Sequence, residues 1–195
     1  DEKDLAAFTN PRKTGELTLK KTVESPVDED NSKDYTFTIT LDVDVNGTFT
    51  ATGAESSVTF TNGVAEVKLA ADENITIKGL PANVEYTVVE DAEAYMVTGS
   101  TGEAGTIPAE DKAEVAFTNK RDQGELEITK IVESTNDDDH SRTYHITVTM
   151  DEDIADGQYG ELTFTDNVAK YDISDNETIT ATDLPAGITY KVEEE

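Results

Sequence analysis

Apolar and polar residues alternate along several short stretches of the chain, and this alternation predicts β-strands. Residues 35–41 read Tyr-Thr-Phe-Thr-Ile-Thr-Leu, and residues 144–150 read Tyr-His-Ile-Thr-Val-Thr-Met. Because successive side chains of a strand point to opposite faces, each stretch would bury one face and expose the other. The spacing of apolar residues that is typical of amphipathic helices is nearly absent. The pattern therefore predicts an all-β protein.

This strand pattern occurs twice along the chain. Residues 15–25 align with residues 124–134 without a gap, and the tripeptide Phe-Thr-Asn ends a segment at Asn10 and again at Asn119. Short strands at this spacing, separated by turn signals such as Asn62-Gly63, are typical of immunoglobulin-like β-sandwiches. We therefore expect tandem immunoglobulin-like β-sandwich domains, arranged end to end.

The repeat also predicts where the domains begin and end. We expect residues 11–123 to form a complete β-sandwich. Residues 124–195 would form a second β-sandwich that lacks its last strand. Residues 1–10 would be the closing strand of a preceding domain or of a neighbouring copy of the chain.

The charge of the chain limits its partners. Its 195 residues include 15 basic and 43 acidic side chains, which give a net charge of −28 at pH 7. Such a charge repels nucleic acid and anionic membrane surfaces, so we exclude both as partners. There is no cysteine, and hence no disulfide bond or thiol chemistry. We also expect no membrane insertion, because no apolar stretch is long enough to cross a bilayer, and we recognise no export signal in these residues.

Three predicted strands each place one polar side chain on their apolar face. Lys21, Glu90 and Asn119 each continue a row of apolar residues at alternate positions. A buried charge or amide without a partner costs several kcal/mol, so we expect the three side chains to meet. Lys20, next to Lys21, points to the opposite face and is expected in solvent.

Two interpretations of this trio stay open. The simpler one is a buried Lys–Glu ion pair with the asparagine hydrogen-bonded to it. In the other, the lysine amine has attacked the asparagine carboxamide, expelled ammonia and left a covalent amide. Burial favours the neutral forms of an amine and of a carboxylic acid, which are the nucleophile and the proton donor that this reaction needs. The reaction happens once per site, so the protein would not be an enzyme in the ordinary sense.

Five short motifs carry a resemblance to a known family. They are Leu-Lys-Lys-Thr-Val, Tyr-Thr-Phe-Thr-Ile, Ile-Lys-Gly-Leu-Pro-Ala, Tyr-Thr-Val-Val-Glu and Phe-Thr-Asn, in that order. Residues 15–119 and most of residues 124–195 thereby resemble the isopeptide-linkage domains of Gram-positive pilins, which are relatives of the B-type repeats of collagen adhesins. The resemblance implies that Lys21 is joined to Asn119, with Glu90 as the catalyst.

In the second repeat the resemblance is incomplete. Lys130 and Glu194 match the family's lysine and glutamate, but no asparagine follows them within the sequence. Asn10 matches the family's asparagine, but no matching lysine precedes it within the sequence. Residues 1–10 of one copy would then complete the second domain of another copy by strand complementation. The alternative is that the sequence is a stretch of a longer tandem protein.

Other candidate sites are weaker. Residues 42–47 and 151–156 carry alternating acidic groups like the start of a calcium loop, but in the first the closing carboxylate is missing, and strand alternation leading to a turn explains it better. His140 and His145 have no third convincing ligand and are expected in solvent. We therefore expect no metal and no cofactor, and we expect residues 99–105 to form a flexible loop.

These observations predict a structural protein. We expect a subunit or stalk of an extracellular fibre or pilus, at the cell surface or in the cell wall, stiffened by Lys–Asn amide bonds. Its partners would be other copies of itself along the fibre. The alternative function is a ligand-binding adhesin domain that recognises a host protein or glycan, although no loop concentrates the aromatic and arginine residues typical of binding hot spots.

Overall fold

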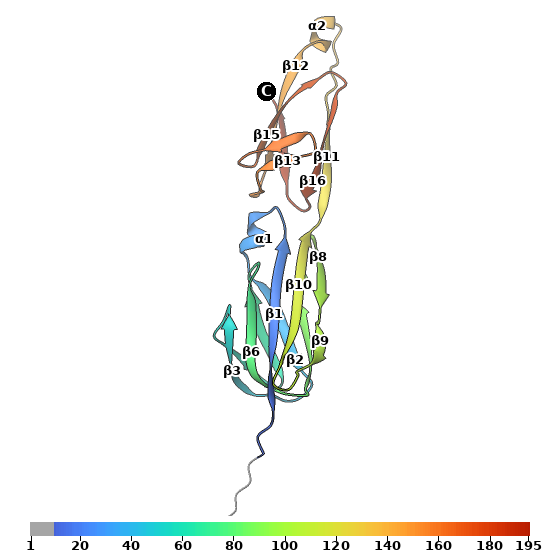
Figure 1. The fold of residues 1–195 in the computed structure, drawn as a ribbon. Helices are drawn as coiled ribbons and strands as arrows, with labels where there is room; N and C mark the ends of the chain where they lie inside the picture. Colours follow the sequence, from blue (N-terminus) through green and yellow to red (C-terminus); the bar gives the residue numbers. More distant parts are fainter. Residues whose placement is uncertain (1–9) are drawn as a thin grey trace, which may run out of the picture. The chain divides into compact units, whose positions relative to one another are not determined.

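A computed structural model describes residues 10–195 of the chain. The predicted closing strand at residues 1–10 therefore lies, except for Asn10, outside the described residues. The described chain is built almost entirely of β-strands and forms two compact units (Figure 1). The prediction of an all-β protein is confirmed. No helix in residues 10–195 has the length and hydropathy needed to cross a bilayer.

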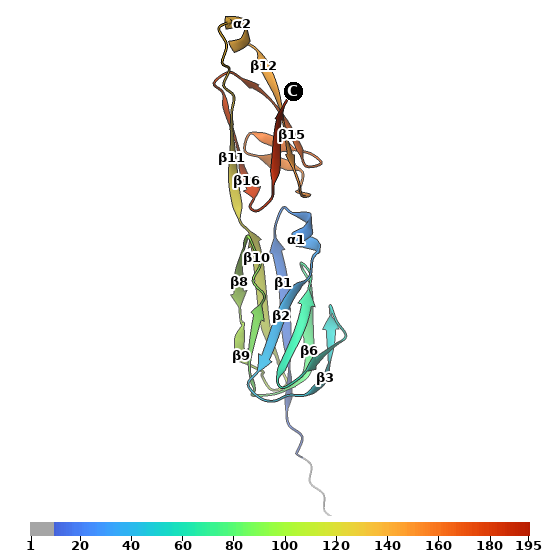
Figure 2. The ribbon, with the colours of Figure 1, turned by 180° about the vertical axis from the view of Figure 1, so that it is seen from behind.

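Two sheets build the first unit. The six-stranded sheet is seen in front in Figure 1, and β2 of the four-stranded sheet comes to the front in Figure 2. In spatial order, the first sheet consists of β4 (Ser57–Phe60), β3 (Gly47–Gly53), β6 (Asn74–Pro81), β1 (Thr14–Glu24), β10 (Lys112–Arg121) and β8 (Met96–Thr101). The second consists of β5 (Val64–Leu69), β2 (Tyr35–Leu41), β7 (Glu85–Glu90) and β9 (Ala104–Thr106).

The apolar faces of the two sheets form the core of the first unit. Along β1, Leu17 and Leu19 are fully buried, and they pair with Ile77 and Ile75 of β6. This alternation of buried and exposed residues is what the sequence pattern predicts.

A tight turn joins β4 to β5 at Asn62-Gly63. Both residues have positive φ angles, 51° and 79°, and the flanking Thr61 and Val64 bond to each other through two backbone hydrogen bonds. Positive φ at both central positions is the geometry that Asn-Gly favours. The predicted turn at this position is confirmed.

β1 and β10, which are the first and last strands of the six-stranded sheet in sequence order, lie side by side. The backbone N–H of Glu16 donates to the carbonyl oxygen of Asp111 at 3.0 Å, and that of Glu110 donates to Thr14 at 2.8 Å. From this shared starting point, β1 and β10 run in the same direction (Figure 1). Neighbouring side chains of the two strands can therefore face the same interior.

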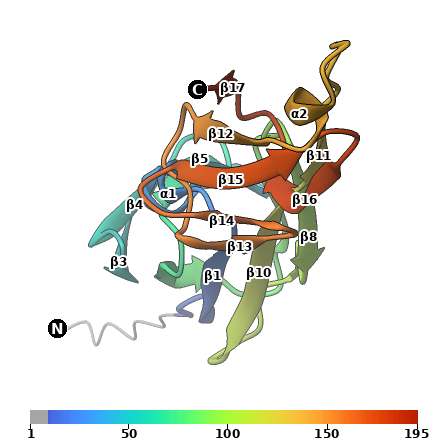
Figure 3. The ribbon, with the colours of Figure 1, turned by 90° about the horizontal axis from the view of Figure 1, so that it is seen from above.

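The second unit contains three small sheets. Figure 3 shows its β13–β14 hairpin beside β15. β11 (Gln123–Thr129) pairs with β16 (Thr178–Pro185), and β12 (Thr143–Met150) lies between β15 (Val168–Ser174) and β17 (Tyr190–Glu194), while β13 (Gly157–Tyr159) pairs with β14 (Leu162–Phe164). Their inward side chains form a core in which Phe164 packs edge-on against Tyr159 at 5.6 Å.

Two short helices, which the alternating pattern does not predict, lie in acidic segments that follow the first strand of each repeat. They are α1 (Asp28–Ser32) and α2 (Asp137–His140). Acidic side chains in the first turn suit the positive end of the helix dipole. At α2, the side chain of Asn136 also accepts a hydrogen bond from the N–H of Asp138. One helical turn is too short to leave a periodic apolar pattern.

Two further expectations were wrong. Residues 99–105 are not a loop, since they belong mainly to β8 and β9, whose exposed faces lack the apolar alternation by which strands are recognised. Residues 42–47 do not continue the strand alternation: β2 ends at Leu41, and the carboxylate of Asp42 accepts a hydrogen bond from the N–H of Glu85 at 2.9 Å.

Candidate cross-link site

Lys21 lies inside the first unit against a carboxylate. Its Nζ atom is 2.7 Å from Oε1 of Glu90, and the two side chains are 0% and 2% exposed. The strand alternation explains this placement: β1 points Lys21 to the same side as its buried leucines, and β7 ends with Glu90 on its inward face. The structure thus brings together two of the three residues that the sequence analysis selected.

Asn119 is fully buried as well. It lies on β10, the strand next to β1 in the six-stranded sheet. Phe117, two positions earlier on the same face, packs against Phe37 of the opposite sheet with ring centroids 5.3 Å apart. The inward face of β10 therefore looks into the core that also holds Lys21 and Glu90.

A tyrosine completes the surroundings of the lysine. The Nζ atom of Lys21 lies 4.3 Å from the ring centroid of Tyr35, the first residue of β2. The electron-rich face of an aromatic ring attracts a cation, which offsets part of the cost of removing the amine from water. The sequence analysis treated Tyr35 only as a core residue. A usable signal was present, because Tyr144 occurs at the same distance after Lys130 in the second repeat.

The second unit contains a matching but more open arrangement. The Nζ atom of Lys130 lies 3.0 and 2.9 Å from the two carboxylate oxygens of Glu194 and 4.1 Å from the ring centroid of Tyr144. Here the lysine and glutamate side chains are 17% and 41% exposed, whereas Lys21 and Glu90 are almost completely buried. The repeat thus preserves the lysine, the glutamate and the tyrosine, while solvent reaches them.

One further asparagine and one further lysine considered in the sequence lie outside the buried site. Asn10 is exposed and precedes β1, and Lys20 points to solvent as expected.

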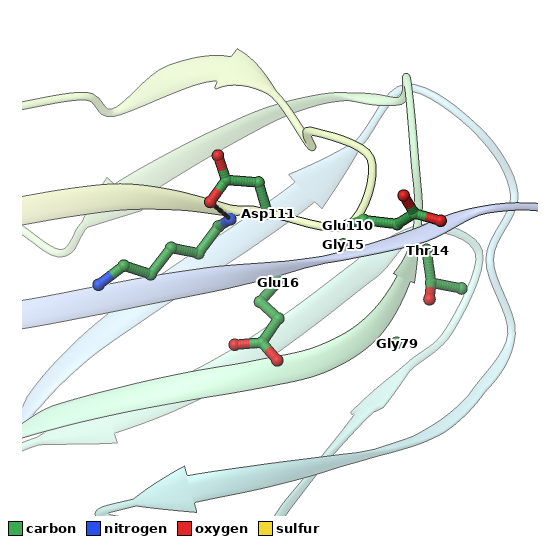
Figure 4. A pocket seen from close by; sticks show the side chains of 7 residues that line it. Thr14, Gly15, Glu16, Gly79, Glu110 and Asp111 are labelled. Atoms are coloured by element: carbon green, nitrogen blue, oxygen red, sulfur yellow. Dashed lines mark hydrogen bonds between the residues drawn. The ribbon is translucent and has the colours of Figure 1, made fainter.

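A surface hollow of the first unit is lined by other residues than the cross-link site. Its cavity volume is about 440 Å³, and Glu16, Glu110, Asp111 and Lys112 lie around it. Figure 4 shows that the three carboxylates do not converge on one point. In residues 10–195, no three acidic or histidine side chains gather closely enough to hold a metal ion.

Both histidines of the second unit have acidic partners. The Nδ1 atom of His140 is 2.6 Å from the carboxylate of Asp175, and its Nε2 atom is 3.0 Å from the carbonyl oxygen of Ser134. Both partners only accept hydrogen bonds, so both ring nitrogens donate and the ring is protonated in this arrangement. The hydrogen bond with Asp175 raises the pKa of His140 and lowers the pKa of Asp175. His145 similarly lies 2.6 Å from Asp172.

Solved structures of pilus proteins share this fold. The major pilin T-13 of Streptococcus pyogenes serotype GAS131465 matches 94% of this chain and 82% of its own, at 15% identity and a TM-score of 0.53. The major pilin of Streptococcus pyogenes matches 93% of this chain and 82% of its own, at 17% identity and a TM-score of 0.50. At these identities the likeness is one of fold, and at that level the resemblance to Gram-positive pilins is confirmed.

A pilus-presented adhesin, Spy0125 (Cpa), is also similar, at 26% identity over 56% of this chain and a TM-score of 0.48. This chain spans only 28% of the length of that adhesin structure. The comparison with curated proteins found no match. A family model described as "Domain of unknown function (DUF7601)" matches twice, at residues 15–121 and at residues 124–195. The chain therefore belongs to the DUF7601 family, and the domain of this family occurs in it twice.

Proposed function

We propose that the chain is a structural subunit or stalk segment of an extracellular fibre, such as a pilus, on a Gram-positive cell surface or wall. Its role is mechanical and not enzymatic: it stays joined to other copies of itself when the fibre is under tension. The pilin fold supports this function. The observation that carries the proposal is the dry Lys21–Glu90 pair, on a strand that neighbours the Asn119-bearing strand.

The proposed chemistry joins the first strand of the first unit to the last. The neutral amine of Lys21 attacks Cγ of Asn119, a new C–N bond forms, and the Cγ–Nδ2 bond breaks. The amine loses one proton, and the leaving group gains one and departs as ammonia. Glu90, 2.7 Å from the amine, is the group placed to carry that proton. The atoms balance without a cofactor.

The direction of the strands explains what such a bond would achieve. β1 and β10 are neighbours that run in the same direction, and Lys21 and Asn119 both lie near the ends of their strands. Force that enters through β1 would cross the covalent bond at Lys21 and leave through the last residues of β10. The sheet between these residues would carry little of the load, and the unit would resist extension.

Pulling single molecules by their two termini tests this proposal. With the bond in place, the segment between residues 21 and 119 cannot extend, so only the second unit should lengthen. In Glu90→Gln, which keeps the side-chain size but removes the acid, an additional unfolding event should release roughly 300 Å of chain, at about 3.3 Å per residue. Glu85→Gln, an exposed glutamate on the same strand, is the matched control. A wild-type protein that already shows the additional event would contradict the proposal.

No observation in the described residues favours the adhesin alternative over the fibre. Exposed large apolar side chains in residues 10–195 are few and scattered over both repeats. The fibre therefore stands as the proposed function, with other copies of the chain as its partners and strand complementation as one way in which they join.

A further inference from the structure

One buried charged side chain takes no part in the proposed reaction. Among residues 10–195, the buried polar and charged residues are Lys21, Asn119 and Asp30, and Asp30 is only 2% exposed. It lies in α1, the short helix that follows β1. Removing a carboxylate from water is costly unless the group is paired and hydrogen-bonded, so the partners of Asp30 indicate what this placement achieves.

Asp30 pairs with an arginine of the strand that carries Asn119. The Nη1 atom of Arg121 lies 3.2 and 3.1 Å from the two carboxylate oxygens of Asp30, and the Arg121 side chain is 9% exposed. Hydrogen bonds between two charged groups are shorter and stronger than those between neutral groups. Arg121 is the last residue of β10 and continues the row of inward positions that includes Asn119. The pair therefore links the end of β10 to α1.

Local hydrogen bonds fix α1 at the end of β1. Ser25 directly follows this strand, and its hydroxyl donates to the carboxylate of Asp30 at 2.6 Å. The side-chain amide of Asn31 donates to the carbonyl oxygen of Ser25 at 3.0 Å. The serine–aspartate contact recurs in the second repeat, where Ser134 donates to Asp139 at 2.7 Å. Asp30 is thus a fixed acceptor at the end of the strand that carries the reactive lysine.

β10 is linked to β1 at its other end as well. The backbone N–H of Glu16 donates to the carbonyl oxygen of Asp111, just before β10, at 3.0 Å. A slip of β10 by one residue along β1 would turn Asn119 to the opposite face of the sheet. Links at both ends of the strand oppose such a slip. Smaller displacements also matter, because a misplacement of about 1 Å between reacting groups can slow a reaction about 100-fold.

We propose that Asp30 and Arg121 are positioning residues for the amide bond between Lys21 and Asn119. Their ion pair holds the end of β10 beside the end of β1, so that the carboxamide of Asn119 stays within reach of the amine. Neither residue transfers a proton in this reaction, which is the role of Glu90. The inference rests on the proposed function and adds to it the contact that aligns the two reacting strands.

The rate of bond formation tests this role. The chain is made by cell-free synthesis, translation is stopped, and the loss of ammonia is followed by intact mass, while circular dichroism reports the folded fraction. Asp30→Asn and Arg121→Met should each slow the loss of ammonia in fully folded chains by about tenfold or more. The double variant should be no slower than the slower single variant, because both changes remove one contact.

Two conservative variants complete the comparison. Arg121→Lys keeps the charge and should recover part of the rate lost in Arg121→Met; it also provides the comparison if Asp30→Asn does not fold. Lys33→Met is the matched control, because the Nζ atom of Lys33 lies 3.6 Å from the carboxylate of Asp30 but does not connect α1 to β10. Its rate should equal that of the wild type.

Hydrogen exchange gives a measurement that does not need the reaction. In the Glu90→Gln chain, which forms no bond, adding Asp30→Asn should speed amide exchange in residues 115–121 by about tenfold or more and leave residues 64–69 unchanged. Unchanged exchange at the end of β10 would overturn the inference.

The two proposals fail in different ways. A wild-type chain that never loses ammonia overturns the proposed chemistry, and the positioning role with it. If the wild type loses ammonia and the folded Asp30 and Arg121 variants lose it equally fast, only the positioning role is overturned. A pair that merely stabilises the fold would give that second result, with a lower Tm and an unchanged rate.

Discussion

Replacing Asn119 with alanine isolates the contribution of the proposed bond to stability. The change removes the carboxamide and leaves the amine of Lys21 beside the carboxylate of Glu90, so neither group is buried without a partner, which alone would cost about 3–5 kcal/mol. The bond closes a loop of about 100 residues, for which the chain-entropy model used for disulfides gives a stabilisation of roughly 4–5 kcal/mol. A stabilisation of that order is a large part of the total free energy of unfolding of a typical domain, which is about 5–15 kcal/mol.

Thermal unfolding of the first unit, followed by calorimetry, measures this effect. For a domain of about 100 residues, each kcal/mol shifts Tm by roughly 4–8 °C, so Asn119→Ala should lower Tm by about 20 °C or more. Asn74→Ala, an exposed asparagine at the start of β6, is the matched control and should change the free energy by no more than about 0.5 kcal/mol. If Asn119→Ala costs only the roughly 1–3 kcal/mol of a lost buried hydrogen bond, no covalent closure contributes to stability.

Three further changes test other parts of the structure. His140→Asn introduces the residue that Asn31 supplies at the matching place of the first repeat. Because the pKa of His140 is raised in the folded state, its stabilisation is present below its ordinary pKa and is lost as the pH rises through the folded value. The variant should therefore lose the fall in Tm of the second unit between about pH 6 and 8, and an unchanged pH dependence would contradict this. Phe164→Ala, in the core of the second unit, should lower its free energy of unfolding by about 3–5 kcal/mol in a denaturant titration, and a loss below about 1 kcal/mol would contradict the packing. Gly63→Ala should cost more than about 1 kcal/mol by the same assay, since its φ is +79° and a Cβ atom would approach the carbonyl oxygen of Val43 to 2.6 Å; a neutral result would contradict the turn geometry.

Strand alternation alone located most of the site. It placed Lys21, Glu90 and Asn119 on inward faces, and all three are buried. These inward positions follow from the sequence because the period of two along a strand leaves no choice of face once the apolar positions are known. The contact between Tyr35 and Lys21 was missed, because in the sequence a tyrosine at the start of an apolar face looks like an ordinary core residue. Only the structure shows that the amine of Lys21 lies over its ring.

The features that the sequence analysis missed are those without an apolar pattern. The side chains of β8 and β9 are exposed and therefore show no apolar periodicity. Backbone pairing with neighbouring strands holds these two strands in place. α1 and α2 are single turns held by local hydrogen bonds, such as that from Ser25 to Asp30 and its counterpart from Ser134 to Asp139. Contacts of this kind depend on distances that residue types alone do not specify.

The intact mass of the denatured monomer tests the central claim most directly. A covalent bond between Lys21 and Asn119 predicts a mass lower than that of the sequence by one ammonia, and a tryptic digest in which the peptides carrying these two residues stay joined. Glu90→Gln and Lys21→Met should each show their full sequence mass, while Lys20→Met should keep the deficit. A wild-type monomer at its full sequence mass would contradict the account.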